Sequence, residues 1–509
     1  MHIEKIKSPA DLRALDQDQL EELCREIREF LVDAVSRTGG HLGSNLGAVE
    51  LTIAVHRVFE SPRDVILWDT GHQAYVHKLV TGRADMFSSL RQRHGLSGYP
   101  SNTESEHDIV ENSHASTSLS WASGLSAGFD LTGHKHRQVV AVIGDGSMTG
   151  GMAFEALNNL GHYGQRAVII LNDNGRSYAP TVSRLATVMS RVRQSPNYVK
   201  GRQAVVNILD RMPLGEEVKR GLSGAAAAMR EMWEPPAFFE TLGVRYLGPI
   251  DGHDIEALES ALSDASSYED GPIVVHVLTD KGRGYAPAED DEEKHLHDIG
   301  LFDPATGNSS SASGKNFTSE FSNSLLTIAE RRPDVVAITA AMPGSTGLLP
   351  FQQRYPDRFF DTGIAEQHAL TSAAGMARAG LRPFVAIYST FLARGFDQVM
   401  YDIGLHGLPV VICIDRAGVT GPDGASHHGV HDIAMYARVP GMTIFSPSSL
   451  QELPVMMNQA LETNGPVAIR WPRGTADESS VVGQGLSARL VRDGQDVAIL
   501  AAGKMLKAA

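Results

Sequence analysis

The sequence predicts an α/β protein made of two αβα domains with mostly parallel sheets, plus the first strand of an incomplete third α/β domain. Three observations predict this class. Short runs that are apolar throughout alternate with helical stretches, a serine-rich segment divides the chain, and a new strand pattern begins after a break near residues 474–485. Strands that helices cover on both faces are typically apolar along their whole length.

The composition is typical of a globular chain with large buried cores. Of its 509 residues, 42% are hydrophobic and 21% are charged, and at about 150 residues a domain this length predicts two to four domains. The formal net charge of -15 argues against nucleic acid or an anionic membrane as the main partner. Cys24 and Cys413 lack metal-site spacing, and no stretch resembles a secretion signal or a membrane span. We therefore expect a reduced, cytoplasmic protein.

The predicted elements follow from hydrophobic periodicity. A helix is predicted over 17–37, with Asp16 as its N-cap and Gly39-Gly40 at its end. Strands are predicted over residues 139–144, 167–172, 272–279, 335–341, 383–389, 409–415, 443–447 and 496–503.

Domain boundaries follow from composition. Residues 307–315 are small and polar, so they are predicted to be a linker between a first domain, 1–306, and a second, 316–478. Residues 479–509 would begin the third domain. Residues 176–245 combine helical patterns with five prolines and no convincing strand, which predicts a helical insertion or cover over the first domain.

Two polar triplets flank one predicted strand–helix–strand unit. Gly144-Asp145-Gly146 follows the strand 139–144, a helix is expected over roughly 151–161, and Asn172-Asp173-Asn174 ends the next strand. A right-handed βαβ unit brings both triplets to the carboxyl edge of one parallel sheet, where ligands bind. The glycines let backbone N–H groups approach a phosphate, and the Asp145 and Asn174 oxygens suit Mg²⁺.

This spacing is the signature of a Mg²⁺ and thiamine diphosphate site. The alternative is a pair of ordinary turns, because Gly, Asp and Asn are common turn formers. The pairing of the triplets around a strand–helix–strand unit favours the cofactor. Thiamine diphosphate enzymes also place a carboxylate against the aminopyrimidine ring, and Glu366 stands at the start of a predicted helix in the second domain.

From about residue 8 to its end, the chain resembles the 1-deoxy-D-xylulose-5-phosphate synthase family of the transketolase superfamily. The motifs that carry this resemblance are TGGHLGSNLGAVELT (38–52), WDTGHQAYVHKLVTGR (68–83), GLSGYP (95–100), GDGSMTGGMAFEALNNLG (144–161), KGRGYAPAE (281–289), DTGIAEQHALTSAAGMA (361–377), YSTFLARGFDQ (388–398), DRAGVTGPDGASHHG (415–429) and WPRG (471–474). Members usually carry a complete third domain, so the resemblance implies a chain truncated at its C-terminus. The stretch NDNGRSYAPT departs from the usual family pattern at Arg176.

The resemblance implies an enzyme and its reaction. Pyruvate would be decarboxylated with thiamine diphosphate and Mg²⁺, and the two-carbon product joined to D-glyceraldehyde 3-phosphate. The product, 1-deoxy-D-xylulose 5-phosphate, begins a route to isoprenoids and is a precursor of thiamine and pyridoxal phosphate. A homodimer is implied, with both halves of each site from one chain and the cofactor held between the two domains.

The resemblance also assigns residues. Asp145, Asn174 and the main chain of Arg176 would hold Mg²⁺. The cofactor would contact His72, Ser113, His114, Ala115, Gly146, Ser147, Asn174, Lys281, Tyr285, Glu366 and Phe391. Tyr388, Arg394 and Arg473 would bind the acceptor phosphate. The residues expected to act in catalysis are Glu366, His41, His427, Asp423 and His297.

Several alternatives stay open. His295 lies two residues from His297, and the spacing of His297 to Phe302-Asp303-Pro304 favours the latter. A transketolase, or the decarboxylating component of a 2-oxo acid dehydrogenase, would share the triplets and the glutamate. The motifs YSTFLAR and GPDGASHHG, with the 176–245 insertion, disfavour both. A binding or regulatory protein that holds the cofactor without turnover is the alternative outside enzymes.

Overall fold

The computed structural model describes residues 3–176, 181, 235–309, 314–479, 482–483 and 486–509. The chain divides into two compact units, Met1–Ser311 and Ala312–Ala509, and the division falls inside the segment predicted as a linker. Each unit holds one parallel sheet, so the predicted fold class of two parallel α/β domains is confirmed.

The first unit is built on a five-stranded sheet in the order β1-β2-β3-β5-β4. All neighbouring strands run parallel, and Gly144 of β2 pairs with Asn172 of β3. The strands are β1 (Val65–Trp68), β2 (Val139–Gly144), β3 (Val168–Asp173), β4 (Arg245–Asp251) and β5 (Ile273–Leu278). The helices are α1 (Pro9–Arg13), α2 (Gln17–Thr38), α3 (Gly43–Gly47), α4 (Val49–Val58), α5 (Tyr75–Lys78), α6 (Ser118–Leu131), α7 (Gly151–Tyr163), α11 (Pro235–Thr241), α12 (Ile255–Ser266) and α13 (Ala286–Glu289).

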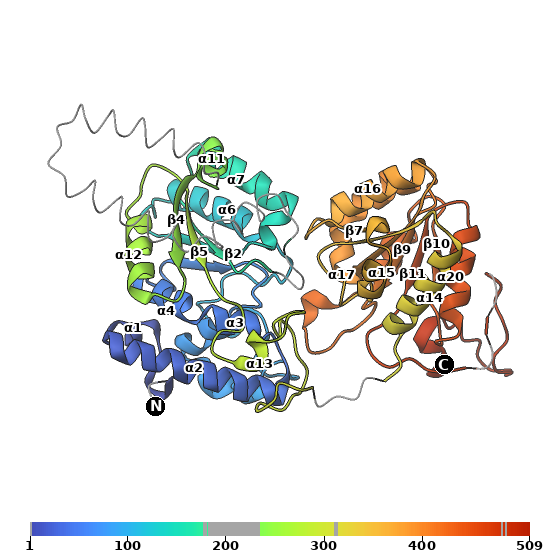
Figure 1. The fold of residues 1–509 in the computed structure, drawn as a ribbon, viewed down its shortest axis with the longest axis horizontal. Coiled ribbons are helices and arrows are strands. Elements are labelled where there is room, and N and C mark those ends of the chain that lie inside the picture. Colours follow the sequence, from blue (N-terminus) through green and yellow to red (C-terminus); the bar gives the residue numbers. More distant parts are fainter. Residues whose placement is uncertain (1–2, 177–180, 182–234, 310–313, 480–481, 484–485) are drawn as a thin grey trace. The chain divides into compact units, whose positions relative to one another are not determined.

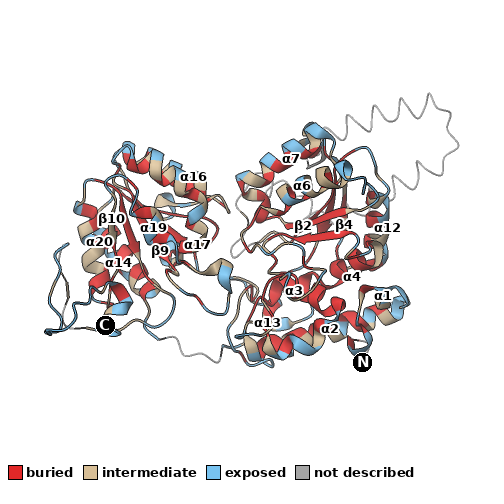
Figure 2. Ribbon diagram, turned by 180° about the vertical axis from the view of Figure 1, so that it is seen from behind, coloured by how far each residue is buried: buried red, intermediate tan, exposed pale blue. Residues whose placement is uncertain are grey.

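The sheet of the first unit has a helical layer on each face (Figure 1). Alternate residues of β2 point to opposite faces: Ala141 joins the core beneath α6 and α7, and Val142 joins the core beneath α4 and α12. Helices therefore cover both faces, and β1, β2, β3 and β5 are buried along almost their whole length, whereas the edge strand β4 is exposed at both ends (Figure 2). A third core lies under α2, α3 and α5.

The second unit has a six-stranded parallel sheet in the order β10-β11-β9-β8-β6-β7. Its strands are β6 (Val335–Thr339), β7 (Phe359–Asp361), β8 (Arg382–Tyr388), β9 (Val411–Asp415), β10 (Thr443–Phe445) and β11 (Val467–Arg470). Its helices are α14 (Phe317–Arg331), α15 (Leu349–Arg354), α16 (Glu366–Arg378), α17 (Ser389–Leu392), α18 (Phe396–Gln398), α19 (Asp432–Tyr436) and α20 (Glu452–Glu462). One core packs α14 and α20 on the sheet, and the other packs α16 on its opposite face.

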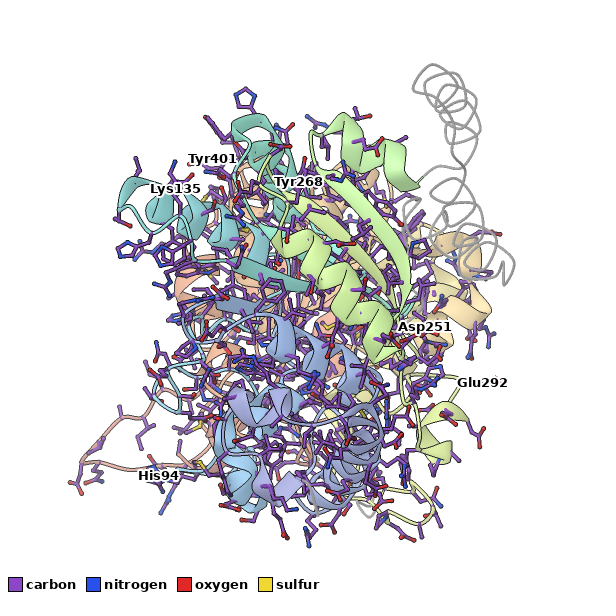
Figure 3. The ribbon with its side chains drawn as sticks, turned by 90° about the vertical axis from the view of Figure 1, so that its left-hand side faces the viewer. His94, Lys135, Asp251, Tyr268, Glu292 and Tyr401 are labelled. Carbon is purple, nitrogen blue, oxygen red and sulfur yellow. The ribbon has the colours of Figure 1, made fainter. Side chains whose placement is uncertain are left out.

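Charged side chains lie mainly outside these layers. Lys135, Asp251 and Glu292 extend from the surface of the first unit (Figure 3), and each is exposed. No helix among the residues that the structure describes is long and apolar enough to cross a membrane.

The helix predicted over 17–37 is confirmed as α2. The side chain of Asp16 accepts a hydrogen bond from the backbone of Gln19, and Gly39 ends the helix with a φ of 70°. Seven of the eight predicted strands form, within a few residues at each end. The sequence interpretation missed β1, β4, β7 and β11, which are short or carry polar residues.

The strand predicted over 496–503 is wrong. These residues form no strand, and a short helical turn, η9 (Gly503–Lys507), begins at their end. An isolated strand leaves its backbone N–H and C=O groups unpaired, and no described strand lies beside it to form a ladder. Most of the predicted insertion over 176–245 lies outside the described residues. At its end, α11 and the start of β4 are described.

Candidate active site

Both polar triplets lie at the carboxyl edge of the first sheet, as predicted. Besides the pairing of Gly144 with Asn172, the backbone N–H of Asp145 donates to the Asn172 carbonyl over 3.3 Å. Asp145 is buried, and its Oδ2 accepts a hydrogen bond from the Thr181 hydroxyl at 2.6 Å. The Asn174 Oδ1 accepts from the backbone N–H of Arg176 at 3.1 Å. Two oxygen-bearing side chains thus follow two adjacent strands.

A buried aspartate and Ser116 connect the glycine turn to the residues that follow the segment 113–115. The Asp69 carboxylate accepts backbone hydrogen bonds from Ser116 at 2.8 Å and Ser118 at 3.0 Å. The Ser116 hydroxyl then donates to the Ser147 carbonyl at 2.6 Å. Ser116 has a φ of 72°, an unusual conformation that these contacts stabilise. The turn predicted to face a diphosphate therefore has a rigid support.

Three predicted histidines form one cluster in the first unit. The ring centroids of His41, His72 and His297 lie 5.1 to 5.7 Å apart. The Asn45 amide of α3 donates to the His41 carbonyl at 2.7 Å and the His72 carbonyl at 2.8 Å, while its Oδ1 accepts from the Tyr75 N–H. One buried side chain thereby fixes two segments that are 31 residues apart in sequence.

Lys281 completes this cluster. Its Nζ lies 2.7 Å from His297 Nδ1, and the Ser44 hydroxyl lies 3.4 Å from the same nitrogen. Burial, helped by the positive charge of Arg176, lowers the pKa of Lys281 to about 7. Burial and the Lys281 charge hold the pKa of His297 well below its ordinary value, so this imidazole is neutral. Neutral His297 can accept a hydrogen bond at Nδ1, and Lys281 can donate it.

Glycines bring the loop of Lys281 and His297 against α3. A Cβ at Gly43 would lie 1.9 Å from the His295 carbonyl oxygen, and one at Gly47 would lie 2.7 Å from the Asp280 oxygen. The Gly43 N–H also donates to the Leu296 carbonyl at 3.0 Å. The glycines of HLGSNLG therefore serve close backbone packing.

His295, Arg176 and Tyr285 point elsewhere. His295 contacts Arg176 at 3.4 Å and the Ala288 carbonyl at 3.0 Å, outside the three-histidine cluster. The Arg176 guanidinium donates to the backbone carbonyls of residues 292 and 293. The Tyr285 hydroxyl donates to the Pro304 carbonyl at 2.9 Å. Of the two histidines that the sequence left open, His297 is the one in the cluster.

The second unit presents a buried carboxylate. Glu366 is the first residue of α16 and is 4% exposed. Its Oε2 has no hydrogen-bond partner among the described residues, and Arg394 Nη1 lies 3.7 Å away. Burial raises the pKa of Glu366, and the Arg394 charge opposes this only in part. A buried oxygen with an unused hydrogen bond is the kind of group that a bound ligand satisfies.

Aromatic rings gather at the end of β8. Tyr388 and Phe391 stack with centroids 5.7 Å apart, and His427 meets Phe391 edge-on at 5.4 Å. The Arg416 guanidinium lies 4.3 Å from the Tyr388 ring centroid. The Thr390 hydroxyl donates to the Ser426 carbonyl at 2.7 Å, which ties the loop of His427 to α17. The structure thus brings three of the predicted residues together.

The two predicted phosphate-binding arginines have different surroundings. Arg394 lies beside Glu366, whereas Arg473 donates to Asp423 Oδ2 at 2.7 Å. The Arg473 side chain is 43% exposed and that of Asp423 is 17% exposed. The sequence interpretation gave Asp423 and Arg473 separate roles, and the structure pairs them.

No group of three or more His, Cys, Asp or Glu side chains is placed to hold a metal within the described part of the chain. Asp145 and Asn174 are accordingly not a self-contained metal cage. A site built on them needs oxygens from the main chain, water or a ligand, which is usual for Mg²⁺.

Comparison with known proteins assigns the family. A family model described as 1-deoxy-D-xylulose-5-phosphate synthase matches residues 3–279, and one described as the transketolase pyrimidine binding domain matches residues 314–477. The 1-deoxy-D-xylulose-5-phosphate synthase of Mycolicibacterium paratuberculosis is 53% identical over 478 residues, which are 94% of this chain and 74% of that protein. The chain belongs to the 1-deoxy-D-xylulose-5-phosphate synthase family.

Two further relatives give the range of similarity. The 1-deoxy-D-xylulose-5-phosphate synthase of Mycolicibacterium gilvum is 51% identical over 500 residues, covering 97% of this chain and 77% of that protein. A solved transketolase from Campylobacter jejuni is 17% identical, with a TM-score of 0.41, over 90% of this chain and 78% of that one. The two segments that the family models match, 3–279 and 314–477, lie in the first and the second compact unit, respectively. Glu366 lies in the segment that matches the pyrimidine binding domain.

Sequence reasoning missed the residues that support this site. Asn45 and Asp69 act through backbone groups, and Arg416 covers the Tyr388 ring. Gln73 accepts a hydrogen bond from Asn172 at 2.9 Å, and its buried Nε2 has no partner among the described residues. Each lies in or beside a motif that carries the family resemblance. The available signal was a polar residue inside an otherwise apolar helix or turn.

Proposed function

We propose that this chain makes 1-deoxy-D-xylulose 5-phosphate from pyruvate and D-glyceraldehyde 3-phosphate, with thiamine diphosphate and Mg²⁺. Family membership supports the reaction. One observation of the structure carries the cofactor half of the proposal. The buried Glu366 Oε2 lacks a hydrogen-bond partner among the described residues, at the start of a helix in the pyrimidine-binding segment.

Glu366 would hydrogen-bond the aminopyrimidine ring nitrogen. When bound, thiamine diphosphate supplies a nucleophilic carbon and an electron sink for decarboxylation. A carboxyl group whose pKa burial raises shares a proton with a ring nitrogen more readily than an exposed one. Phe391 would pack against that ring, and the stacked Tyr388 supports its orientation.

The first unit would bind the diphosphate and the metal. Asp145, Asn174 and the Arg176 main chain offer hard oxygen ligands, and the Gly146-Ser147 turn offers backbone N–H groups. His72 and the turn 113–115 would line the same end, and Asp69 supports that turn. Tyr285 would contribute less directly, because its hydroxyl is bonded to Pro304.

The histidines would move protons at substrate oxygens. His41 and the neutral His297 lie in one cluster with Lys281, so a proton accepted at His297 has a second basic group 2.7 Å away. His427 and Asp423 would serve the same purpose in the second unit. Arg394 and Arg473 would bind the phosphate dianion, with Tyr388 assisting. Arg473 would exchange its Asp423 partner for the phosphate.

An assay of pyruvate- and glyceraldehyde-3-phosphate-dependent CO₂ release and product formation tests the function. We expect turnover that requires both substrates and the cofactor. Glu366→Gln should lower turnover by about 100-fold or more, a loss typical of a removed acid–base group. The exposed His136→Ala provides the control for substitution alone. Turnover with a ketose donor in place of pyruvate, or cofactor binding without CO₂ release, would contradict the proposal.

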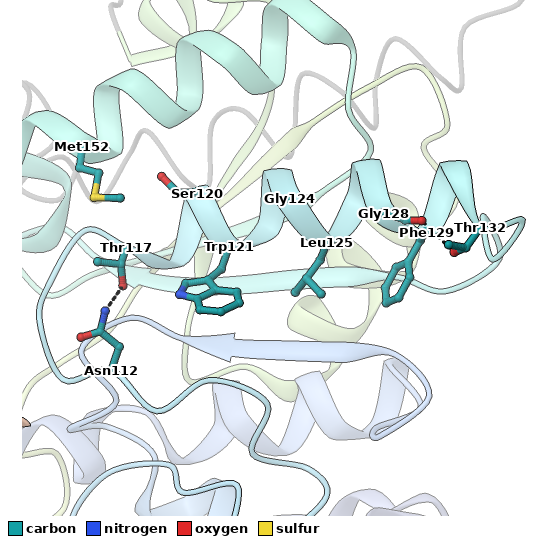
Figure 4. Close-up of a pocket in the computed structure, with 10 residues that line it drawn as sticks. All are labelled: Asn112, Thr117, Ser120, Trp121, Gly124, Leu125, Gly128, Phe129, Thr132 and Met152. Carbon is teal, nitrogen blue, oxygen red and sulfur yellow. Dashed lines mark hydrogen bonds between the residues drawn. The ribbon is translucent and has the colours of Figure 1, made fainter. Parts of the chain in front are cut away.

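We also propose that the chain forms a homodimer. Support comes from one face of α6, where a pocket of about 710 Å³ runs along Trp121, Leu125 and Phe129 (Figure 4). Trp121 is 47% exposed, and a Cβ at Gly124 or Gly128 would meet nothing within 4 Å. An exposed apolar helix face with small residues suits close packing against a second copy.

Analytical sedimentation tests this interface. The wild type should sediment as a dimer and Trp121→Glu as a monomer. A variant with the same mass as the wild type would contradict the interface.

A further inference from the structure

A series of hydrogen bonds leads from α2 to the backbone beside Lys281. Arg28 Nη2 donates to Glu50 Oε2 at 2.7 Å, and the same oxygen lies 3.1 Å from His253 Nδ1. The other ring nitrogen of His253 accepts a hydrogen bond from the backbone N–H of Asp280 at 2.9 Å. The side chains of Arg28, Glu50 and His253 are at most 10% exposed.

These hydrogen bonds fix a single tautomer of His253. A backbone N–H can only donate, so Nε2 of His253 carries no proton, and the proton resides on Nδ1. The Nδ1–H then points at Glu50. Burial alone would raise the pKa of Glu50, but hydrogen bonds from His253 and Arg28 lower it to about 2, so the acceptor stays ionised.

Both sides of Lys281 are attached to this network. His253 accepts from the residue before it, and Arg28 Nε donates to the carbonyl of Arg283 at 3.0 Å, two residues after it. The Gly282 N–H donates to the Gly43 carbonyl at 2.9 Å. The turn is thus held at residues 280, 282 and 283, and Lys281 is directed from it into the histidine cluster.

Backbone packing alone does not set this turn. Gly47 lets the Asp280 carbonyl approach α3, but that contact does not satisfy the Asp280 N–H. His253 is the group that satisfies it. The Asp280 side chain, by contrast, is 70% exposed: its Oδ2 lies 3.8 Å from His253 Nε2 and accepts a hydrogen bond from Arg283 of the same turn at 3.2 Å. The bond to the main chain is therefore the one that positions the turn.

We propose that His253 is a positioning residue for Lys281, acting through the Asp280 N–H and oriented by the Glu50–Arg28 pair. Its consequence for cofactor binding rests on the proposed function. The local consequence does not, because the hydrogen bonds that hold the turn are all made by groups of the protein itself.

Hydrogen exchange of the chain without cofactor tests the local step. His253→Ala should speed exchange of the segment 279–284 by about three- to tenfold, the effect of one lost net hydrogen bond. Exchange in β2 should not change. His253→Gln should restore most of the protection, because its carbonyl can accept from Asp280 and its amide can donate to Glu50. The exposed His136→Ala is the matched control. Unchanged exchange in His253→Ala would overturn the proposal.

Affinity for thiamine diphosphate with Mg²⁺, measured by calorimetry, tests whether His253 acts through Lys281. His253→Ala should weaken binding by about three- to tenfold in the wild-type background and leave it unchanged in Lys281→Met. Equal losses of cofactor affinity in the wild-type and Lys281→Met backgrounds would show that His253 does not act through Lys281. If the wild type itself binds no cofactor, the proposed function fails, and the exchange experiment still decides the role of His253.

Discussion

At the scale of single residues, the candidate site depends on buried polar groups whose partners are backbone atoms. Asn45 holds two backbone segments, Asp69 holds the segment 116–118, and His253 holds the Asp280 turn. Such groups cost free energy when unpaired, so each partner specifies one geometry. Lys281 and Glu366, which we propose for the chemistry, differ from these supporting residues. Burial shifts the pKa of each in the direction that favours its neutral form.

The shifted pKa of Lys281 predicts a pH-dependent cost to stability. Its pKa is about 7 in the folded chain and 10.5 ordinarily, so the folded state carries the full cost of the charged amine below pH 7. This cost falls as pH rises and is absent above 10.5. Lys281→Met should therefore raise the thermal midpoint of the chain, without cofactor, by about 2 °C or more at pH 7 and below.

The increase in thermal midpoint that Lys281→Met causes should become smaller as pH rises toward 10.5. Thermal unfolding across this range provides the measurement, and Lys135→Met, an exposed lysine, is the control. A difference that grows with pH would contradict the assigned direction of the shift.

At the scale of elements, short helices and loops bring the site together by close backbone approach. Helix α3 is only five residues long, yet it contacts the loop of Lys281 and His297 through Gly43 and Gly47. A second connection ties the segment 97–112 to the end of α5. There the Asp108 carboxylate accepts from His77 at 2.8 Å and from Arg83 at 2.6 and 2.9 Å.

Gly43→Ala should disturb the site through α3. The new Cβ would lie 1.9 Å from the His295 carbonyl, so the loop must move, at a cost of about 1 to 3 kcal/mol. The affinity for thiamine diphosphate should also fall, because this loop carries Lys281 and His297. Gly375→Ala in α16 is the matched control, because its Cβ meets nothing within 4 Å and should stabilise the helix by about 0.5 to 1 kcal/mol. Chemical unfolding and calorimetry measure both, and an unperturbed Gly43→Ala would refute the packing argument.

Asp108→Asn should destabilise the first unit strongly. The substitution leaves the Arg83 and Lys78 cations buried with one fewer countercharge, which typically costs about 3 to 5 kcal/mol. Asp33→Asn removes the exposed partner of Arg37 and should change the free energy of unfolding by about 1 kcal/mol or less. Urea unfolding compares the two, and equal effects would show that burial does not set the strength of these pairs.

At the scale of the whole molecule, the two compact units have separate hydrophobic cores. Each of the five clusters of buried residues lies wholly within one unit, three in the first and two in the second. The proposed site residues are divided between the same units. Folding and chemistry would therefore have different requirements, because each core forms from one unit and the proposed reaction would use residues of both.

Expressed separately, residues 1–311 and 312–509 should each fold, and neither should release CO₂ from pyruvate. Each part should show its own cooperative thermal transition by circular dichroism, because it retains all of its described core. The full chain, assayed alongside, is the positive control for turnover. A part that remains unfolded by itself would show that stability, too, depends on contacts beyond its own core.

The sequence by itself determined the elements and the edge where chemistry gathers. Continuous apolar runs predicted seven strands correctly, because strands buried on both faces need apolar residues at every position. The glycine and asparagine triplets predicted the carboxyl edge of β2 and β3, because parallel strands joined by a right-handed crossover end on the same side. Motifs that resemble one family pointed to His41, His297 and Lys281 before any contact among them was known.

Only the tertiary structure decided which groups meet. The approach of His253 to the Asp280 N–H, the pairing of Arg473 with Asp423 and the support of residues 116–118 by Asp69 join residues far apart in sequence, so no local pattern reveals them. The predicted strand 496–503 did not form for the same reason. A strand needs neighbouring strands to pair its backbone, and tertiary structure alone supplies them.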